Sequence, residues 1–307
     1  MHQKILGNSK ADIYTQITNE IISAIEAGAA DFEMPWHRQA QAGLPRNPAT
    51  KKLYQGINAL ALWITRRKAG FASSYWASYL QWNSLGAQVR QGEKGATIVF
   101  YQRKEEDEDV EKDDTQNQAR AVIRYSHVFN GDQVDGWMAN EVSDDANHQK
   151  FSKAVCFINS LQSEIRHGSD TAYYSPALDC IYMPNQSVFR DTKSGSSVEG
   201  YYAVLFHEHV HWSGHPSRLK RDLSGRFGSS AYAMEELIAE LGASFLCATL
   251  GINTYPRSDH AAYIASWLQV LKEHKTAIFA AASAASAASL YLESLATDSS
   301  MEKTANL

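Results

Sequence analysis

One short stretch of the sequence constrains the fold more than any other, because its residue spacing makes chemical sense only on a helix. Residues 198–215 read VEGYYAVLFHEHVHWSGH and contain the pattern H-E-x-x-H at His207, Glu208 and His211. Residues four apart lie about one turn apart on a helix, so both imidazoles project from one face and can hold one Zn²⁺. Glu208 directly follows the first histidine, and we expect it to act as a general base toward a water molecule.

The residues around the motif predict the helix that it needs. Ser196 and Glu199 have the spacing of a capping box, which satisfies the first free backbone N–H groups of a helix. Gly214 stands where the helix would end. His209 would project from the opposite side, and we expect it to make an ordinary hydrogen bond. The alternative to a metal site is a polar helix face that carries histidines by chance.

A zinc site in a hydrolase has three protein ligands and one open position, so a third ligand is needed. Residues 232–246, YAMEELIAELGASFL, predict a second helix with Glu236 and Glu240 one turn apart on one face. We expect Glu236 to be the third ligand and Glu240 to orient a ligating histidine. Two alternatives stay open: Glu235 is the third ligand, or these acids form a solvated helix surface.

The residues before the motif predict a hairpin. Residues 171–184, TAYYSPALDCIYMP, read as two extended runs around a turn at 175–179. An edge strand beside the metal-site helix would let an extended peptide pair with it through main-chain hydrogen bonds. Tyr232 and His215 are the candidates for stabilising an oxyanion.

The net charge of −5 hides a strong asymmetry along the chain. Between Met34 and Phe100, nine basic residues are opposed by a single acid, Glu93, and nine aromatic residues are interleaved with them. Proteins bind single-stranded nucleic acid with positive grooves and aromatic faces on which bases stack, so this composition favours such a surface. The alternative is an ordinary fold with its tryptophans in the core, as we expect for Trp63, and its cations at the surface.

A dense acidic run follows the basic region. The residues EEDEDVEKDD at 105–114 include eight acids in ten positions and predict a solvated loop, which we extend to residue 118. The apolar segments 96–102 and 121–129 predict two strands joined by this loop. The best domain border lies near residue 145, giving domains 1–145 and 146–307.

Periodicity and terminator residues predict several helices. Asp12 is the expected N-cap of the first, which ends at Gly28, and two more are expected at 57–68 and 76–85. Near the C-terminus, the repeat AASAASAAS at 281–289 predicts a helix that packs closely. We expect a disordered tail from about Asp298.

Composition argues against several other classes of protein. No run reaches the roughly 18–20 apolar residues that span a membrane, and the start MHQKILGNSK lacks a secretory signal. The three cysteines are far apart and form no CxxC pair, which argues against a disulfide framework. We therefore expect a soluble, cytoplasmic protein that has no membrane partner.

Several longer segments resemble one known family. The segments PRNPATKKLYQGINALAL (45–62), GFASSYWASYLQW (70–82) and GAQVRQGEKGATIVFY (86–101) resemble the N-terminal single-stranded-DNA-binding domain of ArdC-type antirestriction proteins, which TraC-type conjugative primases share. YSHVFNGDQVDGW (125–137) is similar to the end of that domain. HEHVHWSGHPSRLKRD (207–222) and YAMEELIAELGASF (232–245) resemble the zincin-type metallopeptidase domain that follows it. The matches cover nearly the whole chain in family order.

The resemblance implies an α+β protein: an N-terminal α+β domain with a small antiparallel sheet, then a zincin-like metallopeptidase domain. It implies a protein of a plasmid or mobile element that binds single-stranded DNA and protects incoming DNA from host restriction, typically during conjugation. The family's ligand pattern falls on His207, His211 and Glu236, with Glu208 as the base. Such a ligand set takes Zn²⁺, and it also admits Mn²⁺ or Co²⁺.

We predict DNA contacts of three kinds in the basic region. Phosphate contacts are expected from five cations, stacking from two aromatic rings and polar contacts from three amides: Arg46, Lys51, Lys52, Arg90 and Lys94; Tyr54 and Trp76; and Asn47, Asn58 and Gln81. The acidic run would repel DNA or compete for the basic groove as a mimic.

Three hypotheses for the whole chain follow. In the first, the chain grips DNA, and its metal domain cleaves a protein bound to the DNA or threatening it. In the second, occlusion of the DNA alone protects, and the metal site is proteolytically silent. In the third, the chain is a metallopeptidase whose N-terminal domain serves targeting.

Overall fold

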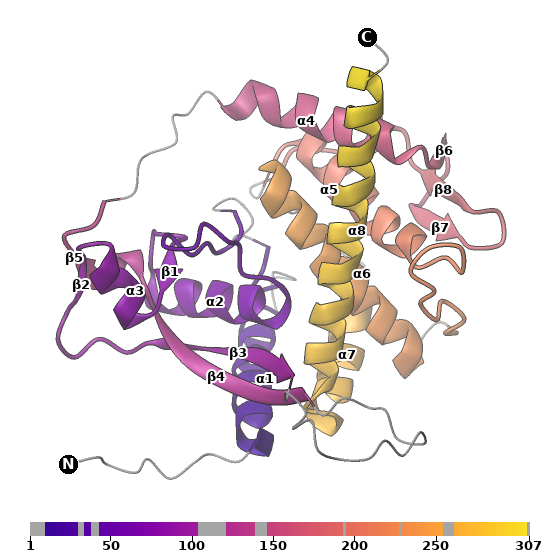
Figure 1. The fold of residues 1–307 in the computed structure, drawn as a ribbon. Helices are drawn as coiled ribbons and strands as arrows, with labels where there is room; N and C mark the ends of the chain where they lie inside the picture. Colours follow the sequence, from indigo (N-terminus) through magenta and orange to yellow (C-terminus); the bar gives the residue numbers. More distant parts are fainter. Residues whose placement is uncertain are drawn as a thin grey trace, which may run out of the picture.

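The structure, a computed structural model, describes residues 10–29, 34–37, 43–103, 121–138, 146–192, 195–226, 229–253 and 261–305. The acidic run and the expected domain border near residue 145 lie outside the described residues. In Figure 1 the N-terminal elements, in indigo to magenta, gather on one side, and the later helices lie on the other.

The N-terminal half combines helices with small antiparallel sheets. Its helices are α1 (Lys10–Gly28), α2 (Gly56–Ala69) and the short α3 (Tyr79–Ser84). Its strands are β1 (Trp76–Ala77), β2 (Gln88–Val89), β3 (Ala96–Arg103), β4 (Ala121–Asn130) and β5 (Val134–Asp135). One sheet has the strand order β1-β4-β3, and a second sheet pairs β2 with β5. A 3₁₀ turn, Gly131–Gln133, separates β4 from β5. The two strands expected on either side of the acidic run are confirmed as the β3–β4 ribbon.

The C-terminal half is a small mixed sheet with long helices. The sheet has the order β6-β8-β7, with β6 (Glu164–His167) parallel and β7 (Tyr173–Ser175) antiparallel to β8 (Cys180–Met183). The helices are α4 (Ala146–Leu161), α5 (Ser197–Ser213), α6 (Ser230–Leu250), α7 (Ala261–Glu273) and α8 (Ala277–Ala305), and a 3₁₀ turn spans Gln186–Val188. The α+β class expected from the sequence is confirmed.

Local signals set most of the helix boundaries. The Ser196–Glu199 capping box begins α5, and Gly214 follows its last residue. Gly70 ends α2 in the left-handed conformation, which a glycine adopts without steric cost. Gly28 is the last residue of α1, as expected.

Three boundary predictions were wrong. Helix α1 begins at Lys10, so Asp12 lies inside its first turn and is not the N-cap. Trp76 and Ala77 form strand β1 opposite Asn130 and Phe129, because the Ser78 capping box starts the helix only at Tyr79. Helix α8 continues to Ala305, past the expected start of a disordered tail, and four of its last five residues, Met301, Glu302, Lys303 and Ala305, are good helix formers.

Helix α8 packs against both halves of the molecule. It contacts α2 as well as α4, α5 and α6. Its small side chains Ala281, Ala282 and Ala285 are fully buried. At Gly242 on α6, an added Cβ would come within 2.8 Å of Val210 and 3.5 Å of the Ala285 carbonyl, so α5, α6 and α8 approach one another very closely.

The residues at this junction form one hydrophobic core. The largest buried cluster includes Ile25, Trp36 and Trp63 from the N-terminal half together with Leu237 and Ala285 from the C-terminal half. Trp63 thus has the core position expected for it. The division near residue 145 stays a prediction, while the packing of the described residues crosses it.

Within the described ranges, one helix is long and apolar enough to cross a membrane by length and composition alone. Residues 277–297 of α8 are long and apolar enough, contrary to the expectation from the sequence. The same helix contributes buried alanines to the shared core, and this packing accounts for its apolar character.

Candidate metal centre and basic surface

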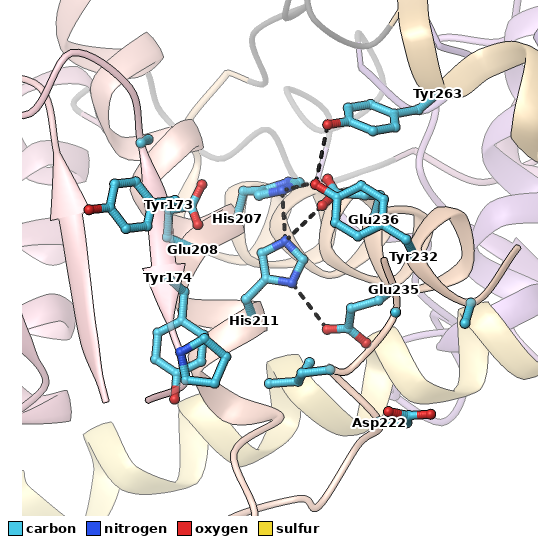
Figure 2. A pocket seen from close by; sticks show the side chains of 15 residues that line it. Tyr173, Tyr174, His207, Glu208, His211, Asp222, Tyr232, Glu235, Glu236 and Tyr263 are labelled. Carbon is cyan, nitrogen blue, oxygen red and sulfur yellow. Dashed lines mark hydrogen bonds and ion pairs between the residues drawn. The ribbon is translucent and has the colours of Figure 1, made fainter. Parts of the chain in front are cut away.

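Helices α5 and α6 pack side by side and bring three potential ligands together. The ligand atoms of His207, His211 and Glu236 all lie within 4.8 Å of one another (Figure 2). The two Nε2 atoms are 3.1 Å apart, and the Glu236 carboxylate lies 3.4 Å from His207 Nε2 and 3.6 Å from His211 Nε2. Two imidazoles and a carboxylate that converge on one point are a donor set that suits a divalent metal ion.

The charge state of Glu236 fits the same interpretation. Burial by itself would raise the pKa of this carboxyl group. The hydrogen bond from His207, the nearby His211 and the Tyr232 hydroxyl outweigh burial and lower the pKa to about 2. The carboxylate is therefore ionised, as a metal ligand must be.

A carboxylate stands behind each histidine. Glu240 Oε2 lies 3.7 Å from His207 Nδ1, which is an ion-pair distance and longer than a hydrogen bond, so its orienting role stays a prediction. Glu235 Oε1 lies 3.1 Å from His211 Nδ1. A hydrogen bond such as the one between Glu235 and His211 fixes the orientation of a ligating imidazole ring and makes it more basic.

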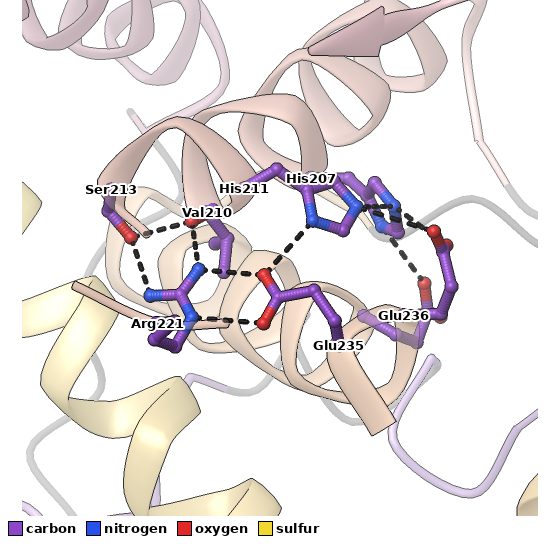
Figure 3. Close-up of polar contacts among 8 residues, drawn as sticks. His207, Val210, His211, Ser213, Arg221, Glu235 and Glu236 are labelled. Atoms are coloured by element: carbon purple, nitrogen blue, oxygen red, sulfur yellow. Dashed lines mark hydrogen bonds and ion pairs between the residues drawn. The ribbon is translucent and has the colours of Figure 1, made fainter. Parts of the chain in front are cut away.

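Arg221 holds Glu235 in this position, as Figure 3 shows. Its guanidinium makes two hydrogen bonds to the Glu235 carboxylate, of 2.9 and 3.1 Å. It also donates to the Val210 carbonyl at 2.5 Å and to Ser213 Oγ at 3.0 Å. Both oxygens of the Glu235 carboxylate therefore already have partners, which are His211 Nδ1 and the Arg221 guanidinium. Its position does not support the alternative that Glu235 is the third ligand, because one residue along a helix turns a side chain by about 100°.

The three potential ligands open into a cavity of about 240 Å³. Glu208, the expected general base, lines this cavity, and so do Tyr232 and Tyr263. The Tyr232 hydroxyl lies 3.3 Å from that of Tyr263, and burial raises its pKa, so it remains a neutral donor. His215, the other candidate for stabilising the oxyanion, is not one of the described residues that line the cavity, and its ring contacts Ser217 instead.

The expected hairpin forms the wall of the cavity opposite α6. Strand β7 is an edge strand of its sheet, and Tyr173 and Tyr174 line the cavity. Arg218 makes an ion pair with Asp179 in the hairpin turn, and its guanidinium lies 3.8 Å from the centre of the Trp212 ring. The arginine thus ties the hairpin to the end of α5.

His209 has the structural role expected for it. The ring is fully buried and contacts Ser163 Oγ at 2.8 Å and the Leu205 carbonyl at 2.7 Å. Burial lowers the pKa of His209 to about 4, so the ring is neutral at physiological pH.

The five cations expected to contact phosphate are all exposed: Arg46, Lys51, Lys52, Arg90 and Lys94. Arg90 differs from the others because it makes an ion pair with Glu93 at 2.9 Å and lies 3.5 Å from Asp135. Lys51 and Lys52 lie in the loop that returns the chain from Asn47, whose N–H donates to the Lys52 carbonyl.

The side chains of Asn47, Tyr54 and Gln81 contact one another. Asn47 Nδ2 donates to the Tyr54 hydroxyl at 3.2 Å and to Gln81 Oε1 at 3.0 Å, while its Oδ1 accepts from the backbone N–H groups of Ala49 and Thr50. Tyr54 donates to the Trp76 carbonyl, and burial raises its pKa. These groups hold the loop in place, so their assignment as direct DNA contacts is not supported by their positions.

Two further DNA-contact predictions require correction. Trp76 is fully buried in a small core with Leu62 and Val128, so its ring cannot stack on a base. Asn58 makes two hydrogen bonds to the backbone of Val99, of 2.7 and 2.8 Å, and so fastens α2 to β3. Sequence spacing indicated polarity and aromaticity at these positions but could not indicate burial.

Sequence reasoning missed the supports of the metal centre. Arg221 follows the motif by ten residues, yet nothing in its local pattern marks it as a partner of Glu235. Trp36 and His37 both contact Glu240 from more than 200 positions away. Only the tertiary packing reveals such contacts.

The chain is similar to known proteins along most of its length. Residues 11–129 match the N-terminal domain of the anti-restriction factor ArdC, and residues 152–284 match the zincin-like metallopeptidase family. The uncharacterised protein y4eC of Sinorhizobium fredii is 44% identical over 279 residues, which is 89% of each chain. DNA primase TraC of Escherichia coli is 35% identical over 293 residues, covering 90% of this chain but 26% of TraC.

Solved structures agree with these matches. The crystal structure of antirestriction ArdC from plasmid R388 in its metal-free form is 36% identical, with a TM-score of 0.74 over 94% of this chain and 98% of that one. Its Mn(II)-bound structure gives the same identity and TM-score over 93% and 98%. The resemblance stated from the motifs is therefore confirmed: this chain belongs to the ArdC family of antirestriction proteins, with an ArdC-type N-terminal region followed by a zincin-like metallopeptidase domain.

Proposed function

We propose that this chain binds single-stranded DNA through its N-terminal region and protects incoming DNA of a plasmid or mobile element from restriction in the recipient cytoplasm. The match of residues 11–129 to the N-terminal domain of ArdC carries the proposal. The exposed cations on the same region support it, because phosphate binding needs accessible positive charge.

Exposed aromatic rings replace Tyr54 and Trp76 as candidates for base stacking. Tyr79 is 47% exposed, Phe100 45% and Tyr125 43%. Phe100 pairs with Arg124 across the β3–β4 ribbon, which sets an aromatic ring beside a cation. A pair of this kind suits single-stranded DNA, because a base can stack on the ring while a phosphate lies near the cation.

The test is a titration of single-stranded and double-stranded DNA at several salt concentrations. For single strands each phosphate contact contributes about 0.7 to the slope of log affinity against log salt concentration, so replacing Lys51 and Lys52 by Ala should reduce the slope by about 1.4. A double variant of the exposed Lys153 and Lys272, on α4 and α7, is the matched control and should leave the slope unchanged. Equal slopes in both double variants would contradict the assignment of the loop lysines.

We further propose that the cavity between α5 and β7 is a metal-dependent peptidase site. His207, His211 and Glu236 would hold a divalent ion, Zn²⁺ or Mn²⁺, and the Mn(II)-bound ArdC structure is a precedent in a relative. The ion would supply Lewis acidity toward a peptide carbonyl and a water molecule.

The chain's own residues supply the remaining parts. Glu208 takes a proton from the attacking water as general base and can pass it to the leaving amine. Tyr232 donates its hydroxyl hydrogen toward the developing oxyanion. The edge of β7 pairs with an extended peptide and so orients the bond to be cleaved. A protein bound to the DNA, or one that attacks it, is the substrate class that the two regions together suggest.

Glu208→Gln tests the peptidase proposal, with the exposed Glu164→Gln as the matched control. The loss of a general base should lower the cleavage rate of labelled casein by about 10²–10⁴-fold while metal binding is retained. The same variants are then compared for plasmid transfer into restricting and non-restricting recipients. Full protection by Glu208→Gln would mean that DNA occlusion alone protects and that the metal site is proteolytically silent in this role.

A further inference from the structure

We infer that Trp36 and His37 in the N-terminal segment Met34–His37 help to set the metal affinity of the candidate site, because both contact Glu240 and the Glu240 carboxylate lies at ion-pair distance from His207. The inference rests on metal binding at the site proposed above. It goes beyond that site by making its affinity depend on residues from the other half of the chain.

The contacts form a continuous buried path. His37 Nε2 lies 2.5 Å from Glu240 Oε1, and Trp36 Nε1 donates to the same oxygen at 3.3 Å. The other carboxylate oxygen, Oε2, faces His207 Nδ1 at 3.7 Å. Trp36 is 0%, His37 3%, Glu240 5% and His207 3% exposed. Two donors on one oxygen thus fix the plane of the carboxylate that the ligating histidine meets.

The local backbone fixes the His37 ring for this task. Residues 34–37 form a tight turn in which the His37 N–H donates to the Met34 carbonyl at 3.0 Å. The Met34 N–H in turn donates to His37 Nδ1 at 3.1 Å. Because Nδ1 accepts a hydrogen bond, the ring proton sits on Nε2 and points at Glu240.

A connection to the basic region runs through the same turn. Arg67 on α2 donates to the Met34 carbonyl at 3.5 Å. The turn therefore lies between the helix that carries part of the basic region and the carboxylate behind the metal ligand. Linkage is reciprocal, so a turn that raises the affinity for the ion is itself stabilised by the bound ion to the same extent.

A purely structural role for the turn predicts a different outcome. Loss of His37 would then lower the stability of the protein with and without metal by the same amount. A positioning role instead changes the affinity for the ion, because outer partners of metal ligands typically contribute 10–100-fold to affinity. Metal affinity and the geometry of the bound ion therefore separate the two roles.

The experiment uses the full chain and measures Zn²⁺ affinity by competition with a chelator. His37→Ala should weaken binding by up to about 10-fold, the lower end for outer partners because His37 acts through Glu240, and Trp36→Phe, which removes one of two donors, should weaken it less. Thr18→Val is the matched control: Thr18 is also fully buried and joins the halves by a 2.6 Å hydrogen bond to the Lys275 carbonyl, far along the sequence from Glu240. This control should keep wild-type affinity.

Two further measurements keep the result decisive. The visible absorption of the Co²⁺-loaded protein should change in His37→Ala and remain unchanged in Thr18→Val, since it reports ligand geometry. Thermal unfolding in excess chelator establishes that each variant is folded, and if His37→Ala does not fold, Trp36→Phe and His37→Gln take its place. Wild-type affinity and an unchanged Co²⁺ spectrum in the folded variants would overturn the inference. No metal binding by the wild type would instead refute the metal site itself.

Discussion

The candidate metal centre and the basic surface, meaning the exposed cations of the N-terminal half such as Lys51 and Lys52, differ in how strictly the fold determines their geometry. At the metal centre, each potential ligand histidine has a carboxylate behind it, and Glu235 is itself held by Arg221. On the basic surface, Lys51 and Lys52 are exposed loop side chains, and the amides near them serve the loop. Metal coordination needs ligand side chains in a fixed geometry, whereas the electrostatic attraction of phosphate groups needs only positive charge within reach.

This difference teaches which substitutions should matter in each region. At the metal centre a buried polar group should be costly to remove even when it touches no substrate. On the basic surface only the exposed cations should affect binding, and buried polar groups should affect stability alone.

Glu235→Ala should destabilise the protein by about 3–5 kcal/mol, because it leaves the buried guanidinium of Arg221 without its carboxylate. It should also weaken metal binding, since His211 loses its orienting partner. Urea unfolding with and without Zn²⁺ measures both effects. Glu164→Ala is the control, because its ion pair with Arg166 is exposed and should contribute nothing measurable. Equal stability of the two variants would contradict the claim that the Glu235–Arg221 contact contributes more to stability than an exposed ion pair.

Asn58→Ala should destabilise the protein by roughly 2–4 kcal/mol, because it removes both hydrogen-bond partners of the Val99 backbone. The salt dependence of single-stranded DNA binding should stay at the wild-type value in the folded variant. The exposed Asn83→Ala on α3 serves as the comparison and should change neither quantity. A reduced salt slope in a stable Asn58→Ala protein would restore Asn58 as a DNA contact.

The smallest expected effect is the pH-dependent contribution of the Glu199 carboxylate to the stability of the protein. Burial would raise the pKa of this carboxyl group, but hydrogen bonds from Lys150 and from the backbone of Ser196 and Asn253 lower it below 4.5. A lowered folded-state pKa stabilises the protein above the unfolded pKa, and the contribution is lost as the pH falls through the folded value. The free energy of unfolding of the wild type should therefore exceed that of Glu199→Gln by about 1.5 kcal/mol at pH 7. This difference should close as the pH falls below 4.5. A gap that stays constant with pH would contradict this role of Glu199.

The parts predictable from sequence were those in which spacing translates directly into distance. On a helix, residues four apart must share a face, so the motif alone is enough to pair His207 with His211. The relation of Glu236 and Glu240 to the two histidines rested on the same rule and on the family pattern. The capping residues Ser196 and Gly214 likewise act within a few positions of themselves.

The parts that escaped prediction depend on contacts far apart in the chain. Trp76 and Tyr79 are both aromatic residues in a basic region, but only packing decides that the first is buried and the second exposed. The extent of α8 was missed because the expectation of a disordered tail rested on its terminal position alone. Arg221, Trp36 and His37 were missed because no sequence pattern links them to Glu235 or Glu240.

The packing of α8 also bears on how a gene for such a protein can be rearranged. A cut between the two regions would leave one fragment without the helix that covers α2 and the other without Trp36 and His37 beneath Glu240. A recombination event that carries only one half would thus transmit a fragment with an exposed apolar face. The matching stretch of TraC extends over 90% of this chain within a much longer protein, as expected if the block of about 300 residues is inherited whole.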